Sequence, residues 1–93
     1  MKYQVKWTSG FKRDYKHVKK RGYNMDLIDE VIMLLAKGDE QERLVEEYGD
    51  HALQHNWREL HILSDWLLVY YIRENQLVLS LIATGTHSDI FNK

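Results

Sequence analysis

The last third of the chain combines short apolar segments with titratable side chains at their ends. His61 and Asp65 lie four residues apart, and His87 follows the segment Thr84-Gly85-Thr86. Short apolar segments predict strands, but a sheet by itself does not require histidines at its ends. Histidine is the side chain best suited to exchange protons near neutral pH. Because the chain has no cysteine, these residues indicate acid–base chemistry before metal chemistry.

The composition limits the classes of protein to which the chain can belong. A length of 93 residues without internal repeats predicts a single domain spanning residues 1–93. The absence of cysteine excludes disulfides and thiolate metal sites. No segment is long and apolar enough to cross a bilayer, and residues 1–6 lack the apolar core of a secretory signal. We therefore expect a cytoplasmic protein with no membrane partner and no cofactor.

The net charge of −1 conceals an uneven distribution. Residues 1–23 carry eight Lys or Arg against Asp14 alone, whereas residues 24–50 carry nine acids against two bases. The basic segment includes Lys12, Lys16 and Lys19, which could present a basic face to a polyanion such as RNA. The other interpretation is an ordinary solvated helix face, and for a lysine-rich helix taken alone it is the better one.

Hydrophobic periodicity predicts a strand and two helices before residue 39. Apolar and polar residues alternate over residues 3–7, as in a half-buried strand. Two amphipathic helices follow and read as a hairpin. Their predicted boundaries are Thr8 or Ser9 to Gly22 for the first, and Asn24 or Asp26 to Gly38 for the second.

The rest of the chain predicts an acidic connection and three strands. Residues 39–56 are weakly patterned, and we expect them to extend the second helix briefly around Leu44 before forming a loop. Apolar segments follow at residues 58–63, 66–73 and 76–83, joined by links short enough for hairpins. The middle segment is nearly all apolar, which predicts a central strand covered on both faces.

Together these elements predict an α+β fold of two layers. Their order is a strand, a helix hairpin and a three-stranded antiparallel meander. We expect the first strand to pair at the far edge of the meander, with the helices packed on one face of the sheet.

The topology of the meander gathers the titratable residues. The end of its first strand adjoins the start of its second, and its third strand runs parallel to its first. His61, Asp65 and His87 are therefore expected at one edge, and His51 in the preceding loop could join them. Glu59 and His61 point to the same face of the first meander strand.

Several imidazoles and a carboxylate suit the cleavage of RNA by its own 2′-hydroxyl group. One group removes the 2′ proton, a second protonates the leaving 5′ oxygen, and a donor stabilises the phosphorane. Each proton transfer contributes roughly 10²–10⁴-fold, and charge stabilisation adds a comparable amount. An aromatic side chain such as Trp66 or Phe91 can stack on a base.

Plainer interpretations of these residues remain open. Histidines in small proteins often lie at the surface, and we interpret His17 and His55 in this way. His51 and His55 have the i, i+4 spacing of a zinc pair, but the segment between them does not predict a helix and contains no HExxH motif. No metal site is therefore expected. Trp66 starts a core strand and can simply pack there.

The chain resembles the RelE/ParE superfamily of bacterial toxins, and within it the YafQ-like branch of ribosome-associated messenger-RNA endonucleases. The resemblance covers essentially the whole chain. It is carried by Asp50-His51-Ala52-Leu53, Arg58-Glu59-Leu60-His61-Ile62, Asp65-Trp66-Leu67-Leu68-Val69-Tyr70 and Thr84-Gly85-Thr86-His87-Ser88-Asp89-Ile90-Phe91, in this order. The fold of the family is the strand, helix hairpin and meander expected above.

The resemblance also implies roles for individual residues. Catalytic positions carry over onto His51, His61, Asp65, His87 and Phe91. His87 is then the main general acid or base, His51 and His61 are partners for proton transfer or phosphate stabilisation, Asp65 assists, and Phe91 packs against a nucleotide. The residues considered for RNA contact are Lys12, Lys16, Lys19, Arg58 and Trp66.

The chain departs from the family pattern at Ala83, where relatives commonly have an arginine that suits a scissile phosphate. Either Arg58 or a nearby lysine takes its place, or the chain is a weaker nuclease. The second possibility leads to the alternative function of a toxin homologue that mainly binds its antitoxin and co-represses its operon. Gyrase inhibition, as in the ParE branch, is disfavoured because that branch lacks this histidine set.

Family membership further implies partners. These are a cognate antitoxin, the ribosome with its messenger RNA, and operator DNA reached only through the antitoxin complex.

Overall fold

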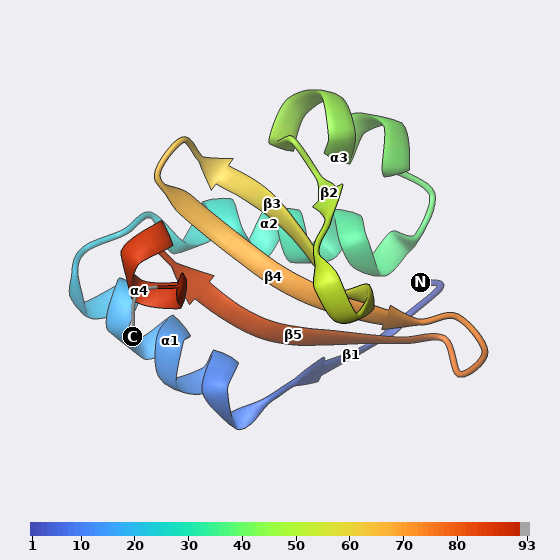
Figure 1. Cartoon of the computed structure of the whole chain (residues 1–93), viewed down its shortest axis with the longest axis horizontal. Helices are drawn as coiled ribbons and strands as arrows, with labels where there is room; N and C mark the ends of the chain where they lie inside the picture. Colours follow the sequence, from blue (N-terminus) through green and yellow to red (C-terminus); the bar gives the residue numbers. More distant parts are fainter. Residues whose placement is uncertain (92–93) are drawn as a thin grey trace.

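The computed structural model describes residues 1–91 (Figure 1). The elements, in chain order, are β1 (Gln4–Trp7), α1 (Ser9–Lys20), α2 (Met25–Lys37), α3 (Gln41–Tyr48), β2 (His51–Ala52), the 3₁₀ turn η1 (Gln54–Asn56), β3 (Arg58–Leu63), β4 (Trp66–Arg73), β5 (Val78–Gly85) and α4 (His87–Phe91). No helix within the described residues has the length and apolar content that crossing a membrane requires.

The strands form one mixed sheet in the order β1-β5-β4-β3-β2. β3, β4 and β5 are the antiparallel meander, and β1 lies parallel to β5 at its far edge. The predicted α+β fold is thus confirmed. β4 is the central strand, and Trp66 to Tyr70 are buried along it on both faces, because consecutive strand residues point to opposite sides.

Local sequence signals set the boundaries of the first two helices. The Thr8 side chain accepts a hydrogen bond from the Phe11 N–H at 3.2 Å and caps α1. Asn24 caps α2 in the same manner, accepting from the Asp26 N–H at 3.1 Å. Gly38 ends α2 in the left-handed conformation, with φ of 79°, which glycine adopts without steric cost. These boundaries match the predicted ones.

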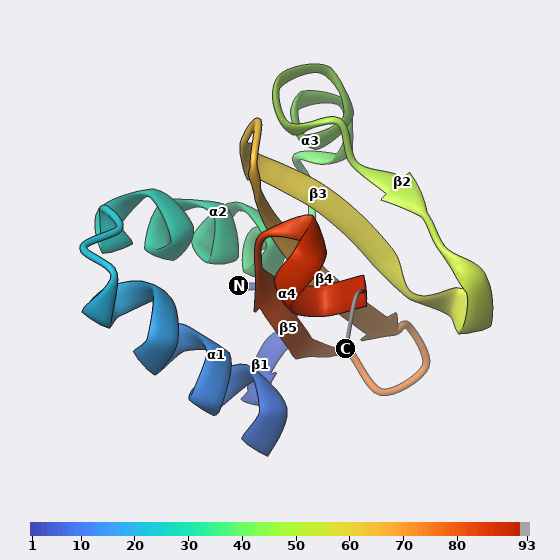
Figure 2. The same cartoon turned by 60° about the vertical axis from the view of Figure 1, so that its left-hand side comes forward.

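Helices α1 and α2 cover one face of the sheet, and α4 lies on the other side (Figure 2). The main core fills the space between α1, α2 and the sheet. It includes Phe11, Val18, Ile28, Val31, Leu35, Leu60, Leu68, Leu79 and Leu81. Two layers were expected, but α4 partly covers the second face, so Leu67 and Val69 of β4 are buried there too.

Three segments differ from the sequence prediction. Residues 39–56 hold a separate helix, α3, and a short edge strand, β2, where a brief extension of the second helix followed by a loop was expected. The helix forms because it buries Leu44, which is 4% exposed. The last strand starts and ends two residues later than predicted, running from Val78 to Gly85. Its pairing with β4 is interrupted opposite Val69 and Tyr70, where Ile82 has no partner in β4. Finally, residues 87–91 form the unexpected helix α4.

Candidate active site

The sheet face that carries α4 also carries the predicted histidines. In antiparallel pairs, residues directly opposite each other point to the same face. His51 pairs with Glu59, Glu59 with Val69, and Val69 with Ala83, so these residues form one row across four strands. The neighbouring row on the same face runs from His61 through Leu67 to Gly85, two residues before His87.

His51 is held between a backbone carbonyl and a buried carboxylate. Its Nδ1 lies 2.9 Å from the Gly49 carbonyl oxygen, and since a carbonyl can only accept, Nδ1 carries a proton. Its Nε2 lies 3.3 Å from Oε1 of Glu59. When the imidazole is protonated, Nε2 and the carboxylate form an ion pair at this distance. The pair is therefore placed so that it can share a proton.

Glu59 is the functional candidate that the sequence analysis did not select. Its side chain is almost fully buried, with the residue 3% exposed, and Oε2 has no hydrogen-bond partner among the described residues. Burial of an incompletely paired carboxylate is costly, and such groups are typical of functional sites. The available signal was an acid within a strand, two residues before His61 and on the same face.

His61 completes a compact group with this pair. It lies two residues beyond Glu59 on the same face of β3, and its ring stacks on that of His51 with centroids 6.2 Å apart. His51, Glu59 and His61 are thus brought together, and His51 joins His61 from the preceding segment in the way the sequence analysis considered.

His87 reaches the same face from the opposite side. It is the first residue of α4, and its ring lies against that of Phe91 with centroids 4.9 Å apart. Because Gly85 lies two strands away from His61 in one row, the backbones at the two sides are separated by about 10 Å. The face between them therefore has acid–base groups on both sides.

Asp65 lies at the same end of the sheet as His61, in the turn that joins β3 to β4. It is exposed, and the described residues provide it with neither an ion pair nor a hydrogen bond. The structure therefore places Asp65 beside the histidine group without a contact to it.

Two of the residues considered for RNA contact, Trp66 and Arg58, make hydrogen bonds within the protein instead. Trp66 is 1% exposed, and its Nε1–H donates to Thr84 Oγ1 at 2.9 Å. It consequently presents no face to a base and packs in the core, which was its plainer interpretation. Arg58 points to the face opposite Glu59 and His61, so it does not occupy the position opened by Ala83.

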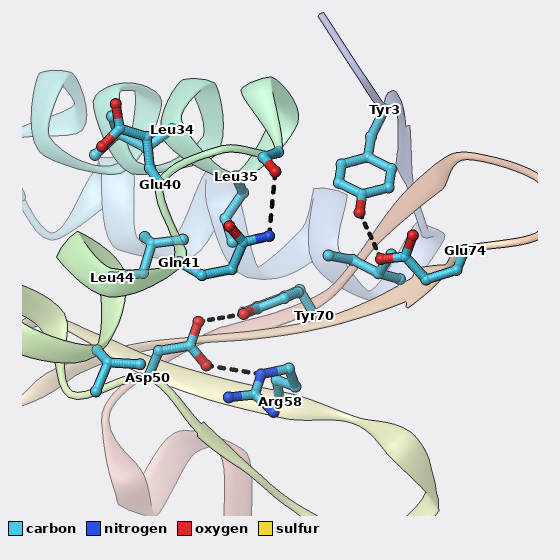
Figure 3. A pocket seen from close by; sticks show the side chains of 13 residues that line it. Tyr3, Leu34, Leu35, Glu40, Gln41, Leu44, Asp50, Arg58, Tyr70 and Glu74 are labelled. Carbon is cyan, nitrogen blue, oxygen red and sulfur yellow. Dashed lines mark hydrogen bonds and ion pairs between the residues drawn. The ribbon is translucent and has the colours of Figure 1, made fainter.

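Arg58 belongs instead to a buried polar cluster beside a hollow of about 420 Å³ between α2, α3 and the sheet. Its Nε–H donates to Asp50 Oδ1 at 2.9 Å, and the Tyr70 hydroxyl donates to Asp50 Oδ2 (Figure 3). The Asp50 side chain is 4% exposed. Because Asp50 immediately precedes His51, this cluster fixes the start of β2 and with it the His51 ring.

A second hollow, of about 580 Å³, lies between η1 and α4. Its walls include the half-exposed rings of Trp57 and Phe91, which are 40% and 48% exposed. His55 and Asn56 in η1 have φ of 64° and 65°, a conformation that costs energy in residues other than glycine. The strained turn thereby brings Trp57 opposite Phe91, and the hollow is suited to a flat aromatic group.

The lysines considered for RNA contact, Lys12, Lys16 and Lys19, are exposed along α1. They lie on the helix layer, across the sheet from the histidines. Within residues 1–91, no three histidine, aspartate or glutamate side chains are grouped closely enough to hold a metal ion.

Comparison with known proteins shows the family to which the chain belongs. Residues 3–92 match a family described as the bacterial toxin of type II toxin–antitoxin system, YafQ. The chain belongs to the YafQ family. It is thus a toxin of the type II class, which agrees with the resemblance seen in its motifs.

Solved structures of relatives share the fold of this YafQ family member. YafQ from E. coli strain BL21(DE3) superposes with a TM-score of 0.85 at 27% identity, covering 96% of this chain and 98% of that chain. YafQ in the E. coli DinJ–YafQ complex gives 0.84 at 28% identity, with the same shares covered. A metal-bound toxin from Helicobacter pylori gives 0.85 at 32% identity, covering 96% and 99%. No curated protein sequence matches the chain.

Proposed function

We propose that this toxin is an endoribonuclease that cleaves messenger RNA on the ribosome by attack of the 2′-hydroxyl on the adjacent phosphate. The observation that carries the proposal is the His51–Glu59 contact, 3.3 Å between Nε2 and Oε1, on the face that also carries His61 and His87. Cleavage of this kind requires one group to accept a proton and another to donate one. A site with acid–base groups on both sides of one sheet face meets that requirement.

In the proposed mechanism, His87 and the His51–Glu59 pair exchange protons with the RNA from opposite sides. His87 is the main acid or base, as the family resemblance implies. The pair supplies or accepts the second proton, because Nε2 and the carboxylate lie close enough to share one. His61, stacked on His51, donates to a phosphate oxygen, and exposed Asp65 assists at the edge of the site. Because these side chains make both transfers, the chemical step needs no divalent metal.

The nucleotide beside the scissile phosphate packs against Phe91 in this proposal. The Phe91 ring lies against His87 and is half exposed, so a base stacked on it is held next to the proposed acid or base. Trp57, on the other wall of the same hollow, provides a second aromatic surface. Stacking of this kind contributes about 1–3 kcal/mol per base.

Three of the exposed lysines of α1 are proposed to contact the phosphates of ribosomal RNA. Lys12, Lys16 and Lys19 lie across the sheet from the histidines, so the ribosome can be bound on one side while messenger RNA enters on the other. Such contacts add affinity in a manner that weakens with salt.

An antitoxin is the expected protein partner, since the family is described as the toxin of a toxin–antitoxin system and E. coli YafQ is known in complex with DinJ. We propose that this chain likewise binds a cognate antitoxin, and that operator DNA is bound only through that complex. The proposed place of action is the cytoplasm, where ribosomes and operator are found.

A second candidate function rests on Ala83. This residue lies in the same row as Glu59, where an arginine would supply a cation to the proposed phosphate site. Without it, the protein could be a weakened nuclease that acts mainly through antitoxin binding and operon co-repression.

End-group analysis of message cleaved on purified ribosomes tests the proposed chemistry. Products with 2′,3′-cyclic or 3′-phosphate ends are expected, because the 2′-hydroxyl is the nucleophile. Products with 5′-phosphate and 3′-hydroxyl ends would exclude this mechanism, and absence of cleavage would favour the second candidate function.

A further inference from the structure

Helix α4 carries His87 and Phe91 but is too short to be stable alone. It spans only His87–Phe91, and isolated helices below about 12 residues are marginal in water. Side-chain contacts from elsewhere must therefore set its orientation, and with it the direction of the His87 ring.

The start of α4 is held by reciprocal hydrogen bonds between Thr86 and Asp89. The Thr86 N–H donates to Asp89 Oδ2 at 2.9 Å, and the Asp89 N–H donates to Thr86 Oγ1 at 3.1 Å. This is the geometry of a capping box. It orders the first turn of α4, but it does not tie the helix to the rest of the protein.

Arg21 provides that tie from the end of α1. Its Nη1 and Nη2 donate to the two carboxylate oxygens of Asp89 at 2.6 and 3.1 Å. Two parallel bonds from a planar guanidinium to a carboxylate fix orientation as well as distance. The Arg21 backbone is itself fixed, because its N–H donates to the His17 carbonyl at 3.1 Å. The same contacts hold the pKa of Asp89 well below its usual range.

The strand that leads into α4 is held by the same helix. β1 pairs with β5 only as far as Leu81, which leaves the edge of β5 open near Thr84. The Thr84 N–H donates to Asp14 Oδ2 of α1 at 3.2 Å. Helix α1 thus contacts the end of β5 through Asp14 and the start of α4 through Arg21.

Gly85 allows Asp89 to approach the backbone closely. Its φ is 147°, and a Cβ at this position would lie 2.9 Å from Asp89 Oδ2. Glycine at this position therefore lets the Asp89 carboxylate lie against the backbone, which is where Arg21 holds it.

We propose that Arg21, acting through Asp89, is a positioning residue that sets the placement of His87 and Phe91. The inference rests on the proposed function, because it assumes that His87 takes part in the chemistry. Arg21 lies at the end of α1, where the lysine side chains are exposed to solvent. Its own side chain instead binds the Asp89 carboxylate.

The test compares Arg21→Ala with Arg21→Lys and with Lys20→Ala, a control on the neighbouring exposed residue of α1. Two measurements need no activity. They are hydrogen exchange of the Ile90 amide, whose N–H donates to the Thr86 carbonyl at 3.2 Å, and the NMR titration of the His87 ring. A third is the rate of message cleavage on ribosomes, separated into kcat and KM.

Arg21→Ala should accelerate Ile90 exchange, shift the His87 titration and lower kcat by on the order of tenfold to a hundredfold, with little change in KM. Arg21→Lys should recover part of each effect, because lysine keeps the charge but not the two parallel bonds. Lys20→Ala should behave as wild type.

Two outcomes would overturn the inference. One is unchanged exchange and titration in Arg21→Ala. The other is a raised KM with unchanged kcat, which would make Arg21 a direct RNA contact. If Arg21→Ala loosens α4 but the wild-type protein cleaves no message, the positioning of α4 stands and the proposed nuclease function fails.

Discussion

Glu59 and Ala83 lie in one row across the sheet, on either side of Val69, with their side chains on the same face. Their backbones are about 10 Å apart, two interstrand spacings. Glu59 Oε2 has no partner among the described residues, and position 83 holds only a methyl group, where the family resemblance implies an arginine. A long cationic side chain at position 83 would therefore reach the space beside Glu59.

The first prediction concerns position 83. Ala83→Arg should raise the cleavage rate about tenfold or more, equivalent to at least about 1.4 kcal/mol of barrier lowering, because a guanidinium can form two bonds to the phosphate. Single-turnover cleavage on ribosomes measures the gain. Ala83→Gln is the control, since it adds length and hydrogen bonding without charge.

The outcome of Ala83→Arg also separates the two candidate functions. No gain in a protein that is already active would mean that another base has taken the role of the arginine. No gain in an inactive protein would favour antitoxin binding and co-repression as the main function.

The second prediction separates activity from stability at Glu59. Glu59→Gln should lower the cleavage rate by roughly 10²-fold, because the amide can neither share a proton with His51 nor accept one. Its melting temperature should stay equal or rise, since a buried, incompletely paired carboxylate is removed. Glu46→Gln, on the exposed surface of α3, is the matched control. Equal activity of Glu59→Gln and wild type would remove Glu59 from the mechanism.

The third prediction concerns His87 in cells. Expression of the wild-type chain without an antitoxin should arrest growth, and His87→Ala should abolish the arrest while the protein remains folded by circular dichroism. His17→Ala, which changes an exposed histidine on α1, should arrest growth like wild type. Undiminished arrest by folded His87→Ala would show that His87 is not the acid–base residue.

The fourth prediction tests the basic surface of α1. Reversing Lys12, Lys16 and Lys19 to glutamate should weaken co-sedimentation with ribosomes, more strongly at low salt, where charges are least screened. Reversing Glu42 and Glu46 on α3 to lysine should not weaken it. If the lysine variant still co-sediments normally, the α1 lysines return to their interpretation as a solvated helix face.

The fifth prediction follows from the depressed pKa of Asp89, caused first by the hydrogen bonds from Arg21 and then by the Thr86 N–H. A carboxyl whose pKa is lower in the folded state stabilises the fold above its unfolded pKa, about 3.9. That contribution is lost as pH falls toward the folded value. The melting temperature difference between wild type and Asp89→Asn should therefore be constant above about pH 5 and shrink below about pH 4. A difference that does not change with pH would contradict the role of this carboxylate.

The sequence by itself determined the framework of the fold. Alternating and helical periodicities, with caps at Thr8, Asn24 and Gly38, depend on contacts within a few residues along the chain. Such local signals predicted the strand, the helix hairpin and the meander. The order of the meander strands then brought His61 and the start of α4 into one region of the sheet.

Tertiary structure decided the elements that short-range signals could not specify. Helix α3 depends on the burial of Leu44, and α4 depends on Arg21, a residue 68 positions away in sequence from its partner Asp89. Elements this short have too few internal hydrogen bonds to form without such contacts. The sequence therefore indicated some helix near Leu44 but not a separate helix α3, and it did not predict α4 at all.

Tertiary structure also decided which polar residues are available for chemistry. Strand alternation placed Glu59 and His61 on one face, but the role of Glu59 appears only because β2 brings His51 across to it. The edge strand is held there by Asp50, which accepts a hydrogen bond from Arg58. Arg58 is therefore bound away from the candidate site. A side chain's function depends on the partners that surround it when folded, and those partners come from segments whose positions only the packed structure sets.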